Sequence, residues 1–376
     1  MEKYRSLFPI TSKFTFLNHA ATAPTSLRVI NAISTLFQNF GSFGGLHYTK
    51  WTNRIQEVRT LFAKLINAEP NEIAFVGNTS EALSLIASGI DWNSGDVVLV
   101  PAPEFPANVY PWMNLEKIGV KVSFITRRNG IFGVKDVEQV LTPKVKLLSV
   151  SSVDFSTGFR CNLEELGRFC QRKGILFCVD AIQSLGIIPM DVKKFGIHFL
   201  ATGGHKWLLS TLGIGALYIS RSVNDLLHPN RIGWKSVVNE EDFSHLHFDL
   251  KPDALRFEAG TMNISGIYAL GIALELLFEA GIQHIQKKIF EINSLLYKGL
   301  RKRKVTVISS MHEEHRSGIL SFIPPGDTES LFNFLIEKNI IVSVRNGNIR
   351  ISPHFYNNDQ DISNFFDSLD RYAREY

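Results

Sequence analysis

Cysteine is scarce in this sequence of 376 residues, which contains only Cys161, Cys170 and Cys178. They form no CxxC pair, and three cysteines are too few for a disulfide scaffold or a zinc site. Cys170 lies on the apolar side of an expected helix and Cys178 inside an expected strand, so we expect both to be small core residues. No cysteine follows Cys178, so the C-terminal half of the sequence offers no thiol.

An excess of charge of one sign and a long apolar run are also missing. The 40 basic and 36 acidic residues are mixed along the chain, with a net charge of +4, so we expect no nucleic-acid partner. The basic run at 301–304 ends an expected helix, where cations suit the helix C-terminus. No signal-like or membrane-spanning stretch is present, which predicts a cytoplasmic protein without a membrane partner.

What the sequence does contain is a regular alternation of short apolar runs and helical periodicity between about residues 72 and 220. This alternation predicts a mainly parallel sheet with helices on both faces, and ligands bind such sheets at the C-terminal ends of the strands. One helix is expected to begin with a capping box formed by Asn162 and Glu165. We expect strands at 97–100, 120–125, 147–153, 175–181, 199–202 and 215–220.

A different pattern follows residue 260 and predicts a smaller α+β unit. A long helical region is expected from Ser265 past Leu300, then β elements at 305–308 and 318–323 and a helix at 329–338. Asn346-Gly347 separates two alternating apolar runs, which is a strong hairpin signal. A final helix is expected at 361–372.

Lys206 is the most informative residue. It stands among small residues, with apolar runs before and after it, so we expect it at a turn between two buried strands. A desolvated ammonium group has a lowered pKa and becomes available as a nucleophile or base. A lysine that forms a Schiff base needs this environment.

Asp180 ends an apolar strand and therefore needs a cation or a hydrogen-bonding partner. It could be a metal ligand, a helix cap or the partner of a protonated ring nitrogen, but no second ligand stands at metal-like spacing. Together with Lys206 it points to pyridoxal 5'-phosphate, with Lys206 forming the imine and Asp180 holding the pyridine nitrogen protonated. Residues 75–83 offer glycine, amide and hydroxyl groups at a helix start, where an anion is favoured.

These motifs resemble the class V aminotransferases of the fold-type I pyridoxal phosphate enzymes. That group includes cysteine desulfurases, selenocysteine lyase, isopenicillin N epimerase and kynureninase. The resemblance runs from residue 16 to residue 353 and is most specific at Asp180-Ala181-Ile182-Gln183 and Gly204-His205-Lys206. It implies a large domain at 18–258 with a seven-stranded, mainly parallel sheet, a small α+β domain at 259–376, and an N-terminal arm at 1–17 that packs on the small domain.

The resemblance also implies the roles of individual residues. Lys206, Asp180 and Phe105 are expected to be catalytic, with Phe105 stacking on the pyridine ring where the desulfurases place a histidine. Phenylalanine can stack but cannot transfer protons. The implied cofactor-binding residues are Thr79, Ser80, Phe105, Asp154, Asp180, Gln183, His205, Lys206 and Thr261.

Three features of the implied site leave alternatives open. Asp154 stands where relatives carry Asn or Gln, and a carboxylate there would repel the cofactor's phenolic oxygen. Arg350 is expected to bind the substrate α-carboxylate. Asn18, His19 and Ala20 are also expected to contact the substrate, although His19 could instead cap its loop.

The resemblance implies an enzyme that acts at the α-carbon of a small amino-acid substrate, and transamination is the expected reaction. The alternatives are a C–S or C–Se lyase, an epimerase or, more remotely, a non-catalytic protein. Transfer of sulfur to a protein thiol is not expected, because no cysteine follows Cys178. Thr261 is expected to reach the partner's phosphate in a homodimer with the active site at the subunit interface. No metal is expected, and residues 312–315 are expected to be a solvated loop.

Overall fold

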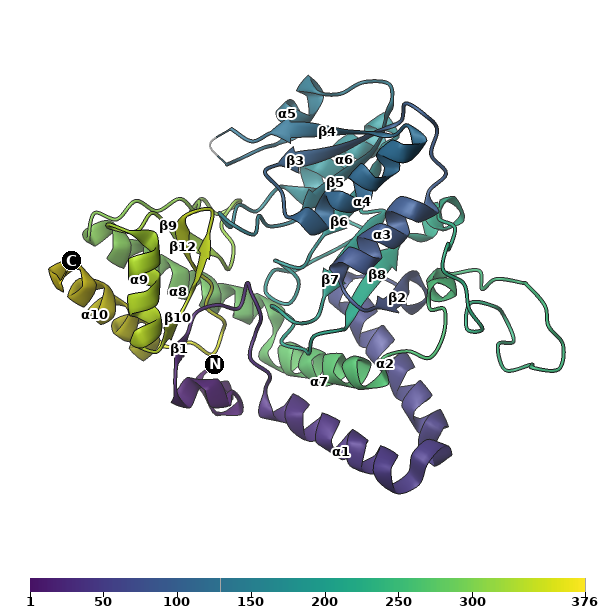
Figure 1. Ribbon diagram of the computed structural model, residues 1–376, viewed down its shortest axis with the longest axis horizontal. Helices are drawn as coiled ribbons and strands as arrows, with labels where there is room; N and C mark the ends of the chain where they lie inside the picture. Colours follow the sequence, from purple (N-terminus) through teal and green to yellow (C-terminus); the bar gives the residue numbers. More distant parts are fainter. Residues whose placement is uncertain (129, 376) are drawn as a thin grey trace.

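A seven-stranded sheet is the centre of the molecule. The computed structural model describes residues 1–128 and 130–375, so residue 376, the end of the expected small domain, lies outside them. Figure 1 shows the sheet, whose strand order is β2-β8-β7-β6-β5-β3-β4. Its strands are β2 (Ile73–Val76), β3 (Val97–Ala102), β4 (Lys121–Thr126), β5 (Val145–Ser151), β6 (Leu176–Asp180), β7 (Phe199–Gly203) and β8 (Gly215–Ile219).

The sheet is mainly parallel, as predicted. Strands β3 to β7 pair in parallel, whereas β8 pairs antiparallel with both β7 and β2. The expected strands match β3 to β8, but β2 was not predicted. Its four residues, Ile73–Val76, form a short edge strand that follows the turn η4 (Pro70–Glu72) directly.

Apolar residues alternate between two cores on opposite faces of the sheet. Leu99 faces one core, and its neighbours Val98 and Val100 face the other. The first core includes residues of α2 (Tyr48–Ile66), α6 (Leu163–Lys173) and α7 (Ile264–Ala280), and the second includes residues of α3 (Thr79–Gly89) and α4 (Tyr110–Met113). Both faces are therefore covered, as a parallel sheet requires. The short helix α5 (Val134–Gln139) follows β4.

The expected long helix after residue 265 is two helices. α7 ends at Ala280, Gly281 adopts a positive φ of 79°, and α8 (Ile282–Lys302) leaves at 76° to it. Glycine tolerates this backbone conformation, so the periodicity continues while the axis turns. Within the described residues, no single helix meets the length and hydropathy of a membrane span. Only the bent pair of α7 and α8 does so together, and α7 is largely buried.

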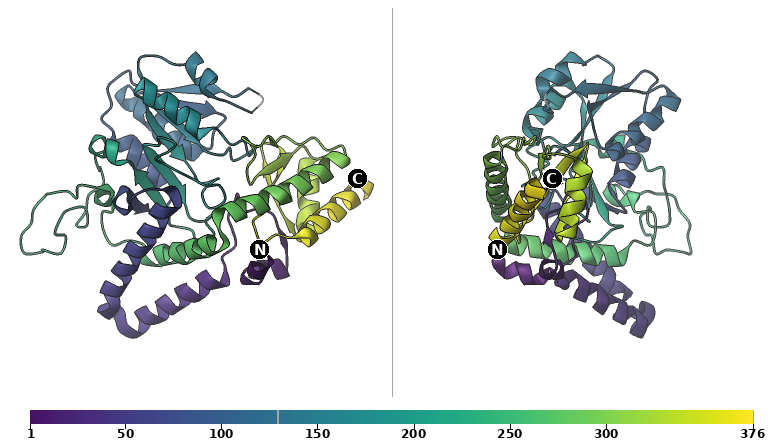
Figure 2. Two further views of the ribbon diagram at one scale, coloured as in Figure 1. Left: turned by 180° about the vertical axis from the view of Figure 1, so that it is seen from behind. Right: turned by 60° about the vertical axis from the view of Figure 1, so that its left-hand side comes forward.

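Helix α7 packs against α1 (Leu27–Phe43) and α2, as Figure 2 shows for α1. Helix α8 instead packs on the C-terminal elements, where α10 (Asp359–Glu375) lies beside it and α9 (Thr328–Glu337) lies beside α10. The division of the chain at residues 258 and 259 stays a prediction.

The C-terminal sheet contains the predicted hairpin. β11 (Ser343–Arg345) and β12 (Asn348–Ile351) pair antiparallel, and β9 (Leu320–Phe322) pairs with β12. Asn346 and Gly347 both have positive φ, as the tight hairpin turn requires. The expected element at 305–308 is reduced to one isolated bridge, from Val307 to Phe322.

The N-terminal segment lies on these C-terminal elements. β1 (Thr15–Phe16) pairs in parallel with β10 (Ile340–Ile341), which is separate from β11. Arg5 forms an ion pair with Asp361 at 2.7 Å, and the ring of Phe8 stacks on Tyr356 at 3.9 Å between centroids.

Candidate active site

A cavity of about 370 Å³ lies at the C-terminal ends of β6 and β7 and at the N-terminus of α3. Ligands of α/β sheets bind at this edge. The hairpin of β11 and β12 contributes arginines from the C-terminal sheet to the same cavity. Nine of the residues predicted from the sequence line it: Ala20, Thr79, Ser80, Phe105, Asp180, Gln183, His205, Lys206 and Arg350.

Lys206 occupies the turn between the antiparallel strands β7 and β8, as expected. Burial lowers the pKa of Lys206 to about 8, Asp180 opposes the shift, and Arg350 and Arg345 add to it. The Lys206 Nζ lies 5.6 Å from the centroid of the Phe105 ring. Its amine is therefore neutral at a much lower pH than that of an ordinary lysine.

Asp180 is the last residue of β6 and is buried. Burial raises the pKa of Asp180 to about 6, while a hydrogen bond from the Ile182 N–H at 2.9 Å and the charge of Lys206 oppose the shift. The carboxylate is therefore ionised at neutral pH and can accept a hydrogen bond from a protonated ring nitrogen.

The start of α3 has the features of a phosphate site. Asn78 caps the helix by accepting a hydrogen bond from the Glu81 N–H, which leaves the Thr79 and Ser80 N–H groups in the first turn. The hydroxyl of Thr79 is buried and has no hydrogen-bond partner. A buried hydroxyl at a positive helix end needs an acceptor, and a phosphate oxygen supplies one.

Gln183 is fixed by two hydrogen bonds. Its Nε2 donates to the Ala20 carbonyl at 3.1 Å, and its Oε1 accepts from the Trp207 indole N–H at 2.9 Å. A primary amide has two N–H donors, so one remains for a ligand oxygen.

Phe105 lies just after β3, with its ring at the cavity. Its N–H donates to Glu104 Oε1 at 2.7 Å, and its ring packs edge-on against Phe155 with 5.2 Å between centroids. Burial raises the pKa of Glu104 to about 7, and Arg127 opposes the shift. The Phe105 ring can stack on a planar ligand beside Lys206 but carries no proton.

Arg350 and Arg345 line the other end of the cavity. Arg350 Nε donates to Ser343 Oγ at 3.0 Å and Nη1 to the Phe155 carbonyl at 2.6 Å, while Nη2 is buried without a partner. Burial and the charge of Arg345 lower the pKa of Arg350 to about 9. A substrate carboxylate would satisfy the unpartnered Nη2.

Arg345 was not predicted from the sequence. Ser343 is paired with Arg350 across the hairpin, and Arg345 is two residues further along β11, so all three share one face. The predicted Asn-Gly turn fixes this register, so the same signal could have identified Arg345.

His19 and Asn18 do not line the cavity. His19 is fully buried, its Nδ1 donates to the Ser352 carbonyl at 2.9 Å, and its Nε2 accepts from the Tyr356 hydroxyl at 2.6 Å. Burial lowers the pKa of His19 to about 3, so the ring is neutral. Asn18 forms a backbone bridge with Ser352. Of the two roles considered for His19, the structure shows the structural one.

Asp154 also lies outside the cavity lining, so the repulsion expected beside a phenolic oxygen does not arise there. Its Oδ2 binds Arg127 at 2.5 Å, and its Oδ1 accepts from the N–H groups of Ser156 and Thr157 at 3.0 and 2.6 Å. Asp154 therefore organises the loop that presents the Phe155 carbonyl to Arg350.

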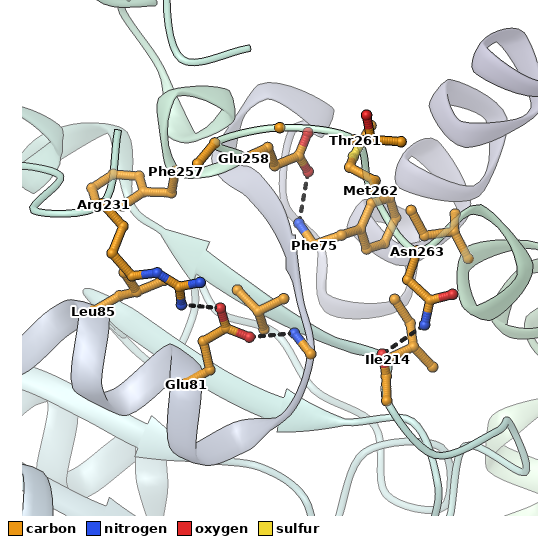
Figure 3. Close-up of a pocket in the computed structure, with 16 residues that line it drawn as sticks. Phe75, Glu81, Leu85, Ile214, Arg231, Phe257, Glu258, Thr261, Met262 and Asn263 are labelled. Atoms are coloured by element: carbon orange, nitrogen blue, oxygen red, sulfur yellow. Dashed lines mark hydrogen bonds and ion pairs between the residues drawn. The ribbon is translucent and has the colours of Figure 1, made fainter. Parts of the chain in front are cut away.

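Thr261 is exposed in a second cavity, of about 180 Å³, between the turn after β2 and the segment before α7. Figure 3 shows the polar contacts between residues that line this second cavity. Glu81 binds Arg231, Glu258 accepts from the Phe75 N–H, and Asn263 donates to the Gly213 carbonyl. The protomer thus holds Thr261 apart from the cavity that contains Lys206.

The cysteines and the polar loop lie apart from the site. Cys161, Cys170 and Cys178 are buried, and burial raises the pKa of each thiol to about 12. His312, Glu314 and His315 hold their ligand atoms within 4.8 Å of one another, with the first two side chains exposed. None of these residues lines the cavity.

The residues present fit pyridoxal 5'-phosphate. The unpartnered Thr79 hydroxyl at the start of α3 fits the phosphate, and the Phe105 ring and the Asp180 carboxylate fit the face and nitrogen of a pyridinium. Gln183 has a spare donor for the phenolic oxygen, and Lys206 has an amine of lowered pKa. Two features of the cavity are not used by the cofactor, namely Arg345 and Arg350.

Comparisons with known proteins agree with this fit. The family model for aminotransferase class-V matches residues 15–365. A probable cysteine desulfurase of Methanothermobacter thermautotrophicus is 30% identical over 99% of this chain and 98% of that protein. The apo structure of a cysteine desulfurase from Thermococcus onnurineus NA1 has a TM-score of 0.92 at 28% identity, covering 100% of this chain and 98% of that one. A C-DES mutant with glycine covalently linked to the PLP cofactor shares the fold, with a TM-score of 0.91, 22% identity, and 97% and 98% coverage.

Proposed function

Because the chain belongs to the class-V aminotransferase family, we propose that it is a lyase that cleaves the Cβ–S bond of a cysteine-derived amino acid. The protein is a pyridoxal-phosphate-dependent enzyme, as the sequence predicted. The observation that carries the finer proposal is that several of its relatives are named probable cysteine desulfurases while its own thiols are all buried away from the cavity. Sulfur would therefore leave to solution and not to a protein thiol.

Lys206 and Asp180 divide the chemistry between them. When bound, the cofactor supplies a carbonyl carbon for the substrate amine and a ring that accepts electrons from the Cα. Asp180, with a pKa of about 6, is ionised at neutral pH and keeps the ring nitrogen protonated. Lys206, with a pKa of about 8, has roughly a tenth of its amine neutral at pH 7 and can take the Cα proton.

The remaining groups hold the substrate and shape the product. Arg350 offers its free Nη2 to the α-carboxylate, and Phe105 restricts the ring without competing for protons. Loss of the Cα proton and of the Cβ–S bond converts L-cysteine and water to pyruvate, ammonia and sulfide. L-cystine and water would give pyruvate, ammonia and cysteine persulfide.

The hairpin over the cavity supports release of sulfur to solution. Between Arg345 and Arg350, which both line the cavity, the chain makes a tight turn at Asn346 and Gly347 and carries no cysteine. The described residues that line the cavity include no cysteine.

Transamination is the second candidate. Asp180 lies where the ring nitrogen would bind, and His205 lies beside the phosphate site. Among the described lining residues, this leaves Lys206 as the only group that can transfer protons at the substrate, and this observation favours transamination. One base that serves both carbons is sufficient for transamination, and the absence of a thiol does not affect it.

Product analysis separates the candidates. The holoenzyme is incubated with L-cysteine or L-cystine, and pyruvate, alanine, ammonia and sulfide are measured, with Lys206→Ala as control. The lyase proposal predicts pyruvate and ammonia in equal amounts without an added keto acid. Turnover that requires a keto acid and yields an amino acid from it would establish transamination instead, and alanine formed from cysteine would establish desulfuration.

We propose a homodimer in which Thr261 completes the partner's phosphate site, since Thr261 is exposed and lies apart from its own cavity. Sedimentation of the holoenzyme should give a dimer, and Thr261→Ala should weaken cofactor retention without changing the mass of the assembly. A fully active monomer would contradict this.

A further inference from the structure

The two ends of the active-site cavity differ in charge. Asp180 lies at the end of the cavity that would hold the pyridine ring, called the ring end here, and its negative charge balances the positive charge of Lys206. At the hairpin end, Arg345 and Arg350 face the cavity, and no acidic side chain of the described residues lines it there. The hairpin end therefore carries two guanidinium charges without a built-in counter-ion.

Asp154 is the acid whose charge acts on Arg350, but its oxygens already have other partners. Its charge raises the pKa of Arg350, but its oxygens are held by Arg127 and by the N–H groups of Ser156 and Thr157. Among the described residues, neither Arg345 nor Arg350 forms an ion pair within 4.0 Å. Each of them lowers the pKa of Lys206, which places both positive charges close to the reacting amine.

Arg350 has room for one carboxylate. Its Nε and Nη1 are anchored to Ser343 and Phe155, so its free Nη2 is the donor that remains for a ligand. The anchors also set the direction of this donor before any ligand binds. Arg350 is therefore preorganised for a single acidic group.

Arg345 is held less tightly and adds a second cationic group. Its Nη1 donates to the neighbouring Val344 carbonyl at 2.7 Å, which leaves the rest of its fork toward the cavity it lines. Two like charges side by side in a partly buried site repel each other, and the charge of Arg345 lowers the pKa of Arg350. A ligand with two acidic groups removes this repulsion, whereas one carboxylate neutralises only half of the charge.

We propose that Arg345 and Arg350 form a two-anion subsite and that the preferred substrate is an amino acid with a second acidic group on its side chain. Arg350 binds the α-carboxylate, and Arg345 binds a carboxylate on the side chain. The proposal rests on the proposed function only in that the cavity binds an amino acid. For the lyase, L-cystine has the required second acidic group in its distal carboxylate. For the transaminase, L-aspartate and L-glutamate have it.

Binding without turnover tests the subsite directly. The holoenzyme is titrated by calorimetry with succinate, which has two carboxylates, and with butyrate, which has the same number of carbons and one carboxylate. We expect succinate to bind at least about tenfold more tightly. Arg345→Gln should remove most of this preference and leave butyrate binding nearly unchanged, and Arg371→Gln, an exposed arginine of α10, should change neither.

Two results of these titrations would overturn the two-anion subsite. If Arg345→Gln weakens succinate and butyrate by the same factor, both arginines clamp one carboxylate and the proposal is wrong. Equal affinity of the native holoenzyme for the two acids would also overturn it. The visible absorption band of the bound cofactor and the unfolding temperature of each variant show whether it is folded and loaded.

Steady-state kinetics extend the test to substrates. Arg345→Gln should raise the KM for L-cystine roughly tenfold or more while the KM for L-cysteine changes little. Failure of Cβ–S cleavage with a retained preference for succinate would refute the lyase proposal and keep the two-anion subsite. Cleavage of L-cysteine with no preference for succinate would do the reverse.

Discussion

The two ends of the cavity are built in different ways. At the ring end, Asp180 ends β6, while Lys206 follows β7 and Thr79 follows β2 at the start of α3, so strands of one sheet set their positions. At the hairpin end, Arg350 is held by the loop around Phe155, so its position depends on a contact between segments 195 residues apart. The residues of the ring end fit the cofactor, and we propose that the hairpin end selects the substrate.

Replacing Lys206 at the ring end should have the largest effect. Lys206→Ala removes the amine that attaches the cofactor and takes the Cα proton, so we expect turnover to fall by about 10³-fold or more. The visible band of the cofactor should also be lost or displaced. Lys193→Ala, which changes an exposed lysine, is the matched control. Native turnover by the Lys206→Ala enzyme would contradict the catalytic role of Lys206.

Asp180→Asn tests whether the charge at the ring end serves chemistry or folding. The substitution keeps the shape and an acceptor oxygen but cannot hold the ring nitrogen protonated, so kcat should fall roughly 10²-fold. Stability should not fall, because the substitution removes a carboxylate charge that burial disfavours, as the raised pKa of Asp180 indicates. A large drop in the unfolding temperature with unchanged kcat would mean that Asp180 is structural.

The pH dependence couples the two ends. The rate at which the cofactor-free protein takes up pyridoxal phosphate should rise with pH and level off above about 8, because the neutral Lys206 amine reacts and its pKa is about 8. Arg345 lowers that pKa, so Arg345→Gln should move the midpoint to higher pH. A midpoint near that of an ordinary lysine, or one that moves to lower pH in the variant, would contradict the electrostatic link.

Asp154→Asn should have the smallest effect on chemistry and a measurable effect on stability. The change leaves the buried Arg127 with Glu104, at 3.5 Å, as its remaining carboxylate, so the free energy of unfolding should fall by about 2 kcal/mol. The cofactor band should stay. Denaturant unfolding measures the change in stability, and the absorption spectrum shows whether the cofactor is retained. Loss of the band with unchanged stability would mean that Asp154 contacts the cofactor.

The sequence predicted the ring end well for a physical reason. Strand ends and helix starts follow from local periodicity and capping, so Asp180 could be placed at a strand end, Lys206 at a turn between strands and Thr79 at a helix start without any long-range contact. Their identity as a cofactor site then followed from a specific family resemblance. The hairpin was predicted too, because Asn346-Gly347 is a local signal.

What could not be predicted depends on distant partners. His19 is fixed by Ser352 and Tyr356, more than 330 residues away, so its sequence neighbours do not show that it is buried. The family resemblance placed Asp154 near the cofactor, and its ion pair with Arg127 is a tertiary contact that the local sequence does not show. Helices α7 and α8 meet at the turn at Gly281, but the apolar periodicity continues through it, so the pattern alone predicts one continuous helix.

Release of sulfur to solution is tested most directly by the intact mass of the enzyme stopped during turnover of L-cysteine, measured together with pyruvate. We predict that pyruvate accumulates while the polypeptide gains no sulfur, because the thiols of all three cysteines are buried and have a pKa of about 12. A polypeptide heavier by one sulfur atom, with alanine in place of pyruvate, would contradict it.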